Sequence, residues 1–218
     1  VLVKSKKTEK LETLVAELAN TIKVELENVE PGLSIELETA ELPKRIISKS
    51  TQEKLTNAVW AAPNDVVRMS DTMPGTVETS SNLAIVKSDK KKVEISCLVR
   101  SFSESAKLAL ASRLESVFKL GGASVVLEGS YPGWKPDVNS EILEVMKNLY
   151  EKQFKKKPEL LAMHAGLECG ILGATYTNWD MISIGPTIKF PHSPDEKVNI
   201  ATVQKYWDFL LNVLVNIP

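Results

Sequence analysis

Three side chains of this sequence stand where a substrate or a metal ion could be held. Arg100 falls at the end of an expected strand, and its planar guanidinium suits a two-point grip on a carboxylate. The two histidines, His164 and His192, fall at the ends of expected strands or in the loops just after them. A neutral imidazole is a good metal ligand. Two imidazoles cannot complete a three-histidine zinc site, although carboxylates could complete a hydrolytic one.

Each of these residues also has a simpler interpretation. Residues 164–170 (HAGLECG) join a strand end to a helix start, where backbone N–H groups can bind a carboxylate or phosphate, but a tight turn explains the glycines as well. His192 lies between Pro191 and Pro194, which would hold a metal ligand in place, yet a surface histidine beside a helix N-terminus fits the same segment. An arginine at a strand end is more often solvated. The residues alone leave these alternatives open.

The two cysteines, Cys97 and Cys169, lie far apart in the sequence. With only two cysteines, this far apart, the sequence excludes a disulfide-rich secreted scaffold and a zinc module made of several cysteines. Neither cysteine lies in a recognisable thiol-protease context, so both are interpreted as packing residues. A reducing cytoplasm is the expected compartment.

The composition is that of an ordinary globular protein. The 218 residues are 43% hydrophobic and 25% charged, and 27 Lys and Arg against 28 Asp and Glu give a net charge of −1. This balance gives no reason to expect the strong basic field that nucleic acid binding needs, and no apolar run reaches the roughly 20 residues that cross a bilayer. We expect neither a nucleic-acid partner nor a membrane partner. The strand-like start without an initial Met predicts a piece of a longer chain.

Residues 1–130 predict helices on one face of an antiparallel sheet, the α+β class. Apolar residues recur at three- and four-residue steps in the expected helices and at every second position in the expected strands. Residues 88–91 form the turn of a predicted β-hairpin, and Ser101 with Glu104 has the spacing of a capping box. The expected helices are residues 9–29, residues 49–61 and a third that follows this box and ends at 120; the expected strands are residues 33–38, 66–70, 76–87, 92–100 and 123–128.

Residues 131–137 (YPGWKPD) interrupt this pattern with two prolines and a glycine, and they predict a domain boundary. Beyond them, expected helices alternate with expected strands, which indicates an α/β layer. Ligands bind at the carboxyl ends of the strands in such layers. The helices are expected at residues 139–155, 167–172 and 200–217, and the strands at residues 159–163 and 180–184.

Five segments taken together resemble the aminoacyl-histidine dipeptidases, also called Xaa-His dipeptidases. These enzymes are relatives of carnosinase in a superfamily of dinuclear zinc peptidases. The segments, in the family's order and spacing, are residues 66–70 (VVRMS), 77–83 (VETSSNL), 131–137, 164–170 and 181–187, the last continuing through 192–196 (HSPDE).

The resemblance implies an enzyme in which a lid domain is inserted into an α/β catalytic domain. Residues 1–132 would be the later part of the lid and dimerisation domain, and residues 133–218 the C-terminal part of the zinc-peptidase catalytic domain. The front half would be missing, and with it the other metal ligands and the glutamate that acts as general base. This chain therefore supplies no catalytic residue and is predicted to be inactive alone.

The resemblance also assigns roles to residues. His192 matches the family's last metal-binding histidine, and Arg100 matches the lid arginine that holds the substrate's terminal carboxylate. Gly166, with His164 and Glu168 near it, matches the loop that lines the substrate pocket. The complete site would hold two zinc ions, with other divalent metals as alternatives. A metal-activated water would hydrolyse Xaa-His dipeptides such as carnosine.

Two other functions stay open. Another hydrolase of the same superfamily, an aminoacylase or a carboxypeptidase, would act on other substrates. Alternatively, the chain acts only as an association module, because related lids carry dimer contacts. The dipeptidase interpretation expects a dipeptide substrate and a cytoplasmic location, and it allows a homodimer formed through the lid.

Overall fold

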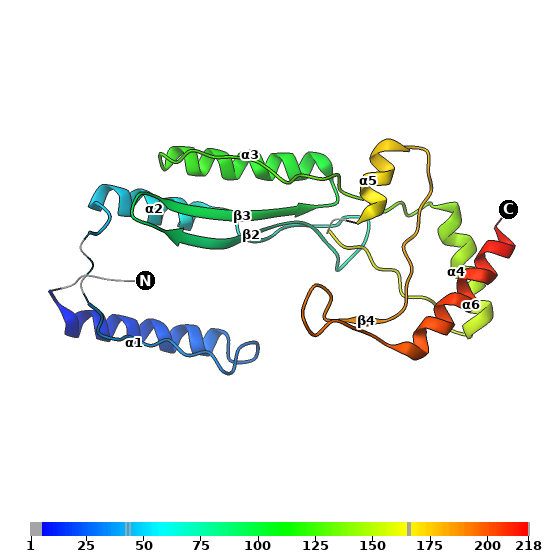
Figure 1. Ribbon diagram of the computed structural model, residues 1–218, viewed down its shortest axis with the longest axis horizontal. Coiled ribbons are helices and arrows are strands. Elements are labelled where there is room, and N and C mark those ends of the chain that lie inside the picture. The colour runs from blue at the N-terminus through cyan, green and yellow to red at the C-terminus, as the bar shows by residue number, and fades with distance from the viewer. Residues whose placement is uncertain (1–5, 42, 44, 165–166, 218) are drawn as a thin grey trace. The chain divides into compact units, whose positions relative to one another are not determined.

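The computed structural model describes residues 6–41, 43, 45–164 and 167–217 (Figure 1). The chain divides into two compact units, Val1–Ser48 and Lys49–Pro218. The predicted boundary between residues 132 and 133 lies inside the second unit and stays a prediction. Among the helices that the structure describes, none has both the length and the apolar stretch that a membrane crossing requires.

The first unit contains one helix, α1 (Thr8–Glu25). Its apolar stripe has the predicted spacing, but no residue of α1 is buried, and Leu14 and Leu18 are each 52% exposed. The helix ends at Glu25, short of the predicted residue 29, because the chain enters a turn there. The strand predicted at residues 33–38 is wrong: no described segment pairs with it, and a strand exists only through hydrogen bonds to a neighbour.

The second unit is built on a three-stranded antiparallel sheet of β1 (Asp65–Met69), β2 (Val77–Ser88) and β3 (Val93–Ser101), with β2 in the middle. The predicted hairpin is confirmed, and the carboxylate of Asp89 forms its turn by accepting hydrogen bonds from the backbone amides of Lys91 and Lys92. These hydrogen bonds lower the pKa of Asp89. Each observed strand differs from its prediction by a single residue at each end.

Two helices and one face of this sheet enclose the first core. Helix α3 (Glu104–Leu120) packs on β2 and β3, and α2 (Lys49–Ala61) packs beside α3. The buried apolar residues of this core are Ala58, Ala62, Leu110, Leu114 and Phe118. Cys97 of β3 packs against them, and burial raises the pKa of its thiol. The α+β class and the packing role of Cys97 are confirmed.

The cap of α3 differs from the prediction. Ser103 is the N-cap residue, and its hydroxyl accepts a hydrogen bond from the amide of Ala106 at 3.5 Å. Ser101 is instead the last residue of β3 and is only 6% exposed. Its hydroxyl lies 2.9 Å from that of Thr79 on β2 and accepts a hydrogen bond from the amide of Ser103, which precedes the helix, at 3.0 Å. The capping box predicted at Ser101 and Glu104 is therefore wrong.

A second core lies between α4 (Glu141–Phe154) and α6 (Ile200–Asn216). Its buried residues are Met146, Phe209 and Val213. The ring of Phe209 contacts those of Tyr150 and Phe154, with centroids 5.4 and 5.9 Å apart. The helix predictions for this region are confirmed, with ends shifted by one or two residues at α4 and one at α6.

The remaining elements of the second unit are short. They are α5 (Glu168–Thr175) and the antiparallel pair β4 (Ile188–Lys189) and β5 (Lys197–Val198). The strands predicted at residues 123–128, 159–163 and 180–184 are wrong, because no described segment pairs with any of them. Their apolar sequences suit a sheet, but the described chain provides no strand beside them.

Candidate functional site

Arg100 and Ser80 lie side by side on one face of the sheet. They are directly opposed in the antiparallel register of β2 and β3. Their neighbours Thr79 and Ser101 are also opposed and are 2% and 6% exposed on the other face, where α3 packs. Because side chains alternate along a strand, Ser80 and Arg100 face away from α3. Arg100 is exposed there, at the end of β3.

His164 meets this pair of residues from a distant part of the chain. Its Nε2 atom lies 2.7 Å from the hydroxyl oxygen of Ser80. The pKa of His164 is lowered, first by burial and second by the positive charge of Arg100. The imidazole is therefore neutral at pH 7. The structure thus brings together two of the predicted site residues and adds Ser80, which the sequence did not single out.

A tight backbone contact fixes the end of β3 against α5. A Cβ atom on Gly133 would lie 2.6 Å from the carbonyl oxygen of Ser101, and one on Gly170 would lie 2.6 Å from that of Pro132. Glycine permits backbones to approach this closely. Residues 131–137 are therefore packed between the end of β3 and α5. This contact places the start of α5 next to the strand that carries the candidate site.

The other residues of the predicted pocket loop are only partly described. Gly166 lies outside the described residues. Glu168 is the first residue of α5, and its side chain is exposed. A carboxylate in the first turn of a helix interacts favourably with the helix dipole. No hydrogen bond or ion pair joins Glu168 to Arg100 or His164 in the described part of the chain, so this local role is the one that the structure gives it.

His192 lies in the loop between β4 and β5 and is exposed. Its backbone has a φ of 63°, in the left-handed region, and its amide donates a hydrogen bond to the Glu196 carboxylate at 2.7 Å. This hydrogen bond fixes the loop backbone and leaves the imidazole exposed. No hydrogen bond or ion pair among the described residues joins His192 to Arg100 or His164.

The described residues do not by themselves fit a metal centre. Within the part of the chain that the structure describes, no three His, Cys, Asp or Glu side chains are grouped so that they could hold a metal ion. A structural or catalytic zinc site needs at least three protein ligands. No such group contains His192, so its predicted role as a metal ligand stays a prediction.

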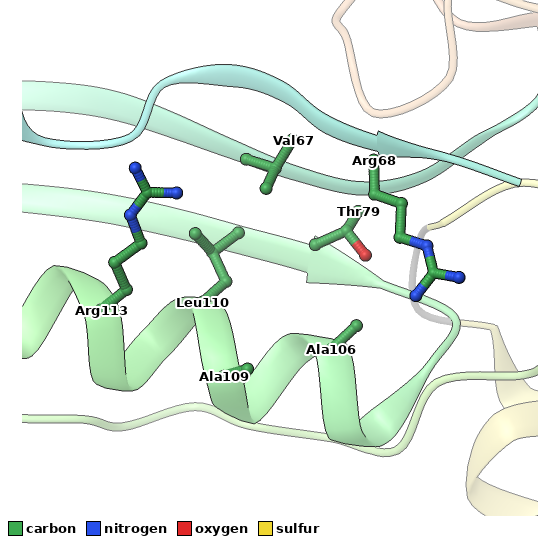
Figure 2. A pocket seen from close by; sticks show the side chains of 7 residues that line it. All are labelled: Val67, Arg68, Thr79, Ala106, Ala109, Leu110 and Arg113. Carbon is green, nitrogen blue, oxygen red and sulfur yellow. The ribbon is translucent and has the colours of Figure 1, made fainter.

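A pocket of about 350 Å³ lies on the opposite face of the sheet, between β1 and α3 (Figure 2). It contains none of the predicted site residues. Arg68 at its edge is already bound to Asp71 and Glu78, at 3.2 and 3.4 Å. The pocket is lined by Val67, Arg68, Thr79, Ala106, Ala109, Leu110 and Arg113. It is separate from the face that carries Ser80 and Arg100.

Comparison with known proteins finds similar dipeptidases. No model of a known protein family matches the chain. The cytosol non-specific dipeptidase of Escherichia coli (strain K12) is 39% identical to this chain over all 218 residues. The crystal structure of aminoacylhistidine dipeptidase from Vibrio alginolyticus matches 98% of the chain, with 41% identity and a TM-score of 0.87. The chain is thus similar to these dipeptidases over nearly its whole length.

The resemblance stated from the five segments is therefore confirmed. The crystal structure of the aminopeptidase PepT from Bacillus cereus matches 74% of this chain, and the match covers 44% of the PepT chain, with a TM-score of 0.61. At 18% identity, this match shows a likeness of fold alone. The chain spans 45% of the Escherichia coli dipeptidase and 44% of the Vibrio alginolyticus dipeptidase. The chain thus corresponds to less than half the length of these two relatives.

Proposed function

We propose that this chain is the C-terminal part of a metal-dependent dipeptidase that cleaves Xaa-His dipeptides. The observation that carries the proposal is the likeness to an aminoacylhistidine dipeptidase over nearly the whole chain. The meeting of Arg100 and His164 supports it, because a dipeptide has a terminal carboxylate close to its scissile bond. A dipeptidase must recognise that group.

Arg100 would bind the terminal carboxylate of the dipeptide. Its guanidinium is exposed and forms no ion pair with another described residue. Two parallel N–H donors of a guanidinium match the two oxygens of a carboxylate. His164, held neutral beside it, would contribute a hydrogen bond to the same substrate. Gly166 and Glu168 are proposed to line the pocket next to it.

The complete protein would hold two zinc ions, or other divalent metals. When bound, they would supply a polarised water for hydrolysis of the peptide bond. From this chain, His192 is proposed as one ligand, with its loop held by Glu196. The other ligands and the general base are proposed to lie in the part of the protein that this chain lacks.

The proposed domain organisation follows the family. Residues 1–132 would form the later part of the lid and residues 133–218 the end of the catalytic domain. A homodimer through the lid and a cytoplasmic location are part of the same proposal, and the name of the Escherichia coli relative supports the location.

The proposal is tested with the complete protein that contains this chain. We expect the zinc-loaded protein to hydrolyse carnosine, and this chain alone to be inactive under the same conditions. Arg100→Gln should raise KM for dipeptides by about tenfold or more, since a charged hydrogen bond contributes roughly 1.5–3 kcal/mol. Arg113→Gln, on the opposite face of the sheet, is the matched control and should leave KM unchanged.

Other results would favour the alternatives. Faster hydrolysis of N-acyl amino acids than of Xaa-His dipeptides would indicate an aminoacylase. A complete protein without peptidase activity would support the association module, which sedimentation of the chain would then examine. Metal-dependent cleavage of carnosine by this chain alone would contradict its predicted inactivity.

A further inference from the structure

The hydrogen bond between Ser80 and His164 links two parts of the chain that are 84 residues apart. Ser80 lies in the central strand and is paired on both sides, with Val66 in β1 and Arg100 in β3. Its hydroxyl is therefore held by a rigid backbone. His164 follows the irregular residues 157–163 and has no such support from its own segment. The serine anchors the histidine.

The Ser80 hydroxyl can donate to Nε2 or accept from it, so this hydrogen bond is compatible with either neutral form of the imidazole. The lowered pKa of His164 favours the neutral ring, which carries a single N–H. A neutral ring that accepts the Ser80 hydroxyl proton at Nε2 carries its own proton at Nδ1. No hydrogen bond joins Nδ1 to another described residue. In that form the Nδ1–H group is a donor on a residue that experiences the positive charge of Arg100.

We propose that Ser80 is a positioning residue that fixes His164 with its Nδ1–H group as a donor, so that His164 and Arg100 together bind one carboxylate. The ligand class is the α-carboxylate of a dipeptide, and in this respect the inference rests on the proposed function. Arg100 supplies the charge. His164 supplies a neutral hydrogen-bond donor that orients the carboxylate without adding a second positive charge. Ser80 holds the His164 ring so that its Nδ1–H group can donate.

The strand register explains why Ser80 can act in this way and its neighbours cannot. Thr79 and Ser81 face α3 and are buried, so their hydroxyl groups point away from His164. Ser96 lies on the same face as Ser80 but on β3, paired with Ile85 and farther from Arg100 along the strand. Ser96 is exposed and therefore provides a matched control.

The test measures KM for two substrates in the complete protein: a dipeptide, and the same dipeptide as its C-terminal amide. We expect Ser80→Ala to raise KM for the dipeptide by about tenfold, with kcat nearly unchanged, because one hydrogen bond to a charged group is weakened. KM for the amide, which has no carboxylate, should not change. Ser80→Thr keeps the hydroxyl and should have the original KM. Ser96→Ala should leave KM unchanged for both substrates.

Two substitutions of His164 examine the proposed donor without relying on Ser80→Ala. The amide of Asn occupies roughly the place of Nδ1, whereas that of Gln occupies the place of Nε2. We expect His164→Asn to keep more of the preference for the carboxylate than His164→Gln. The reverse order would overturn the assignment of the donor.

The outcomes separate this inference from the proposed function. A complete protein that cleaves no dipeptide overturns the proposed function and this inference with it. A protein that is active, and loses its carboxylate preference in Arg100→Gln, supports the proposed function. If Ser80→Ala in that protein raises KM equally for the dipeptide and the amide, or for neither, the role of Ser80 alone is overturned.

Discussion

The charge of Arg100 acts directly on His164. Burial is the first cause of the lowered pKa of His164, and the positive charge of Arg100 is the second. Arg100→Gln removes that charge, so we expect the pKa of His164 to rise towards its ordinary value of 6.5 without reaching it, because burial remains. NMR titration of the imidazole signals measures the change, and His192→Gln identifies which signals belong to His164. An unchanged pKa in Arg100→Gln would contradict the prediction.

Ser81 is a buried polar residue without a partner. It is 3% exposed, and its hydroxyl forms no hydrogen bond with any described residue. A buried hydroxyl of this kind destabilises the fold, so Ser81→Ala should raise the free energy of unfolding by about 1 kcal/mol. Thr79→Val is the control and should lower it, because the hydroxyl of Thr79 is bonded to that of Ser101 at 2.9 Å. Denaturant unfolding measures both, and a loss of stability in Ser81→Ala would count against this account.

The sequence predicted the members of the candidate site but not their meeting. Arg100 and His164 were recognisable by type and by their places at the ends of expected strands. The contact of His164 with Ser80 spans 84 residues, and local periodicity carries no information over that distance. A serine on a strand has no chemical signature of its own. Its one signal was the alternation of β2, which places Ser80 on the face away from the core.

Among the elements, α4 depends on a carboxylate from a distant segment. Asp180 accepts a hydrogen bond from the amide of Ile142 at 3.0 Å. Burial raises the pKa of Asp180, but hydrogen bonds from the Ser140 side chain and from backbone amides outweigh burial and lower it. An ionised carboxylate at a helix N-terminus stabilises the helix.

The pH dependence of this cap follows from the lowered pKa. The folded state binds the proton of Asp180 less tightly than the unfolded state, so the stabilisation is complete above the ordinary value of 3.8 and is lost as the pH falls through the lowered one. We expect Asp180→Ala to lower the free energy of unfolding by about 1 kcal/mol at pH 7. At about pH 3, the free energies of unfolding of Asp180→Ala and of the original chain should differ by less than they do at pH 7. A difference that grows on acidification would contradict the assignment.

The packing of α5 against residues 131–137 requires a glycine at position 170, which has no side chain. A Cβ atom on Gly170 would lie 2.6 Å from the carbonyl oxygen of Pro132. This clash is with the backbone, so it could be relieved only if α5 or residues 131–137 moved. Gly170→Ala should therefore lower the free energy of unfolding by about 2 kcal/mol. Gly173→Ala in the same helix is the matched control, since its Cβ atom would meet only the flexible end of Met181, at 3.0 Å. It should be neutral or stabilising, because alanine favours a helix. Equal effects of the two changes would argue against the close contact.

Helices and the hairpin were predictable because their signals are local. The stripe of α4 and the hairpin of β2 and β3 need only their own residues to be recognised. Residues 159–163 and 180–184 have sequences that suit strands, but a strand forms only beside another one, and the described chain gives them no neighbour. The role of Asp180 was not predictable for the same reason. Its carboxylate binds the N-terminus of α4, and the amide it accepts from lies 38 residues away in the sequence.

The molecule as a whole leaves much apolar surface uncovered. Trp60, Leu120 and Val215 are 91%, 88% and 83% exposed, and many other large apolar side chains are more than one-third exposed. Soluble proteins rarely leave large continuous apolar patches in contact with water. Since the chain spans less than half the length of its relatives, this exposure supports the proposal that it belongs to a longer protein.

The division into two compact units predicts how the whole chain unfolds. No residue of α1 is buried, so we expect removal of residues 1–48 to change the stability of the second unit by less than about 0.5 kcal/mol. All four tryptophans lie beyond residue 48, so their fluorescence during denaturant unfolding reports on the second unit alone. Removal of residues 200–218 is the contrasting change, because it deletes the buried Phe209 and Val213 and should lower stability by more than about 3 kcal/mol. A large shift of the midpoint without residues 1–48 would mean that the second unit depends on the first for its stability.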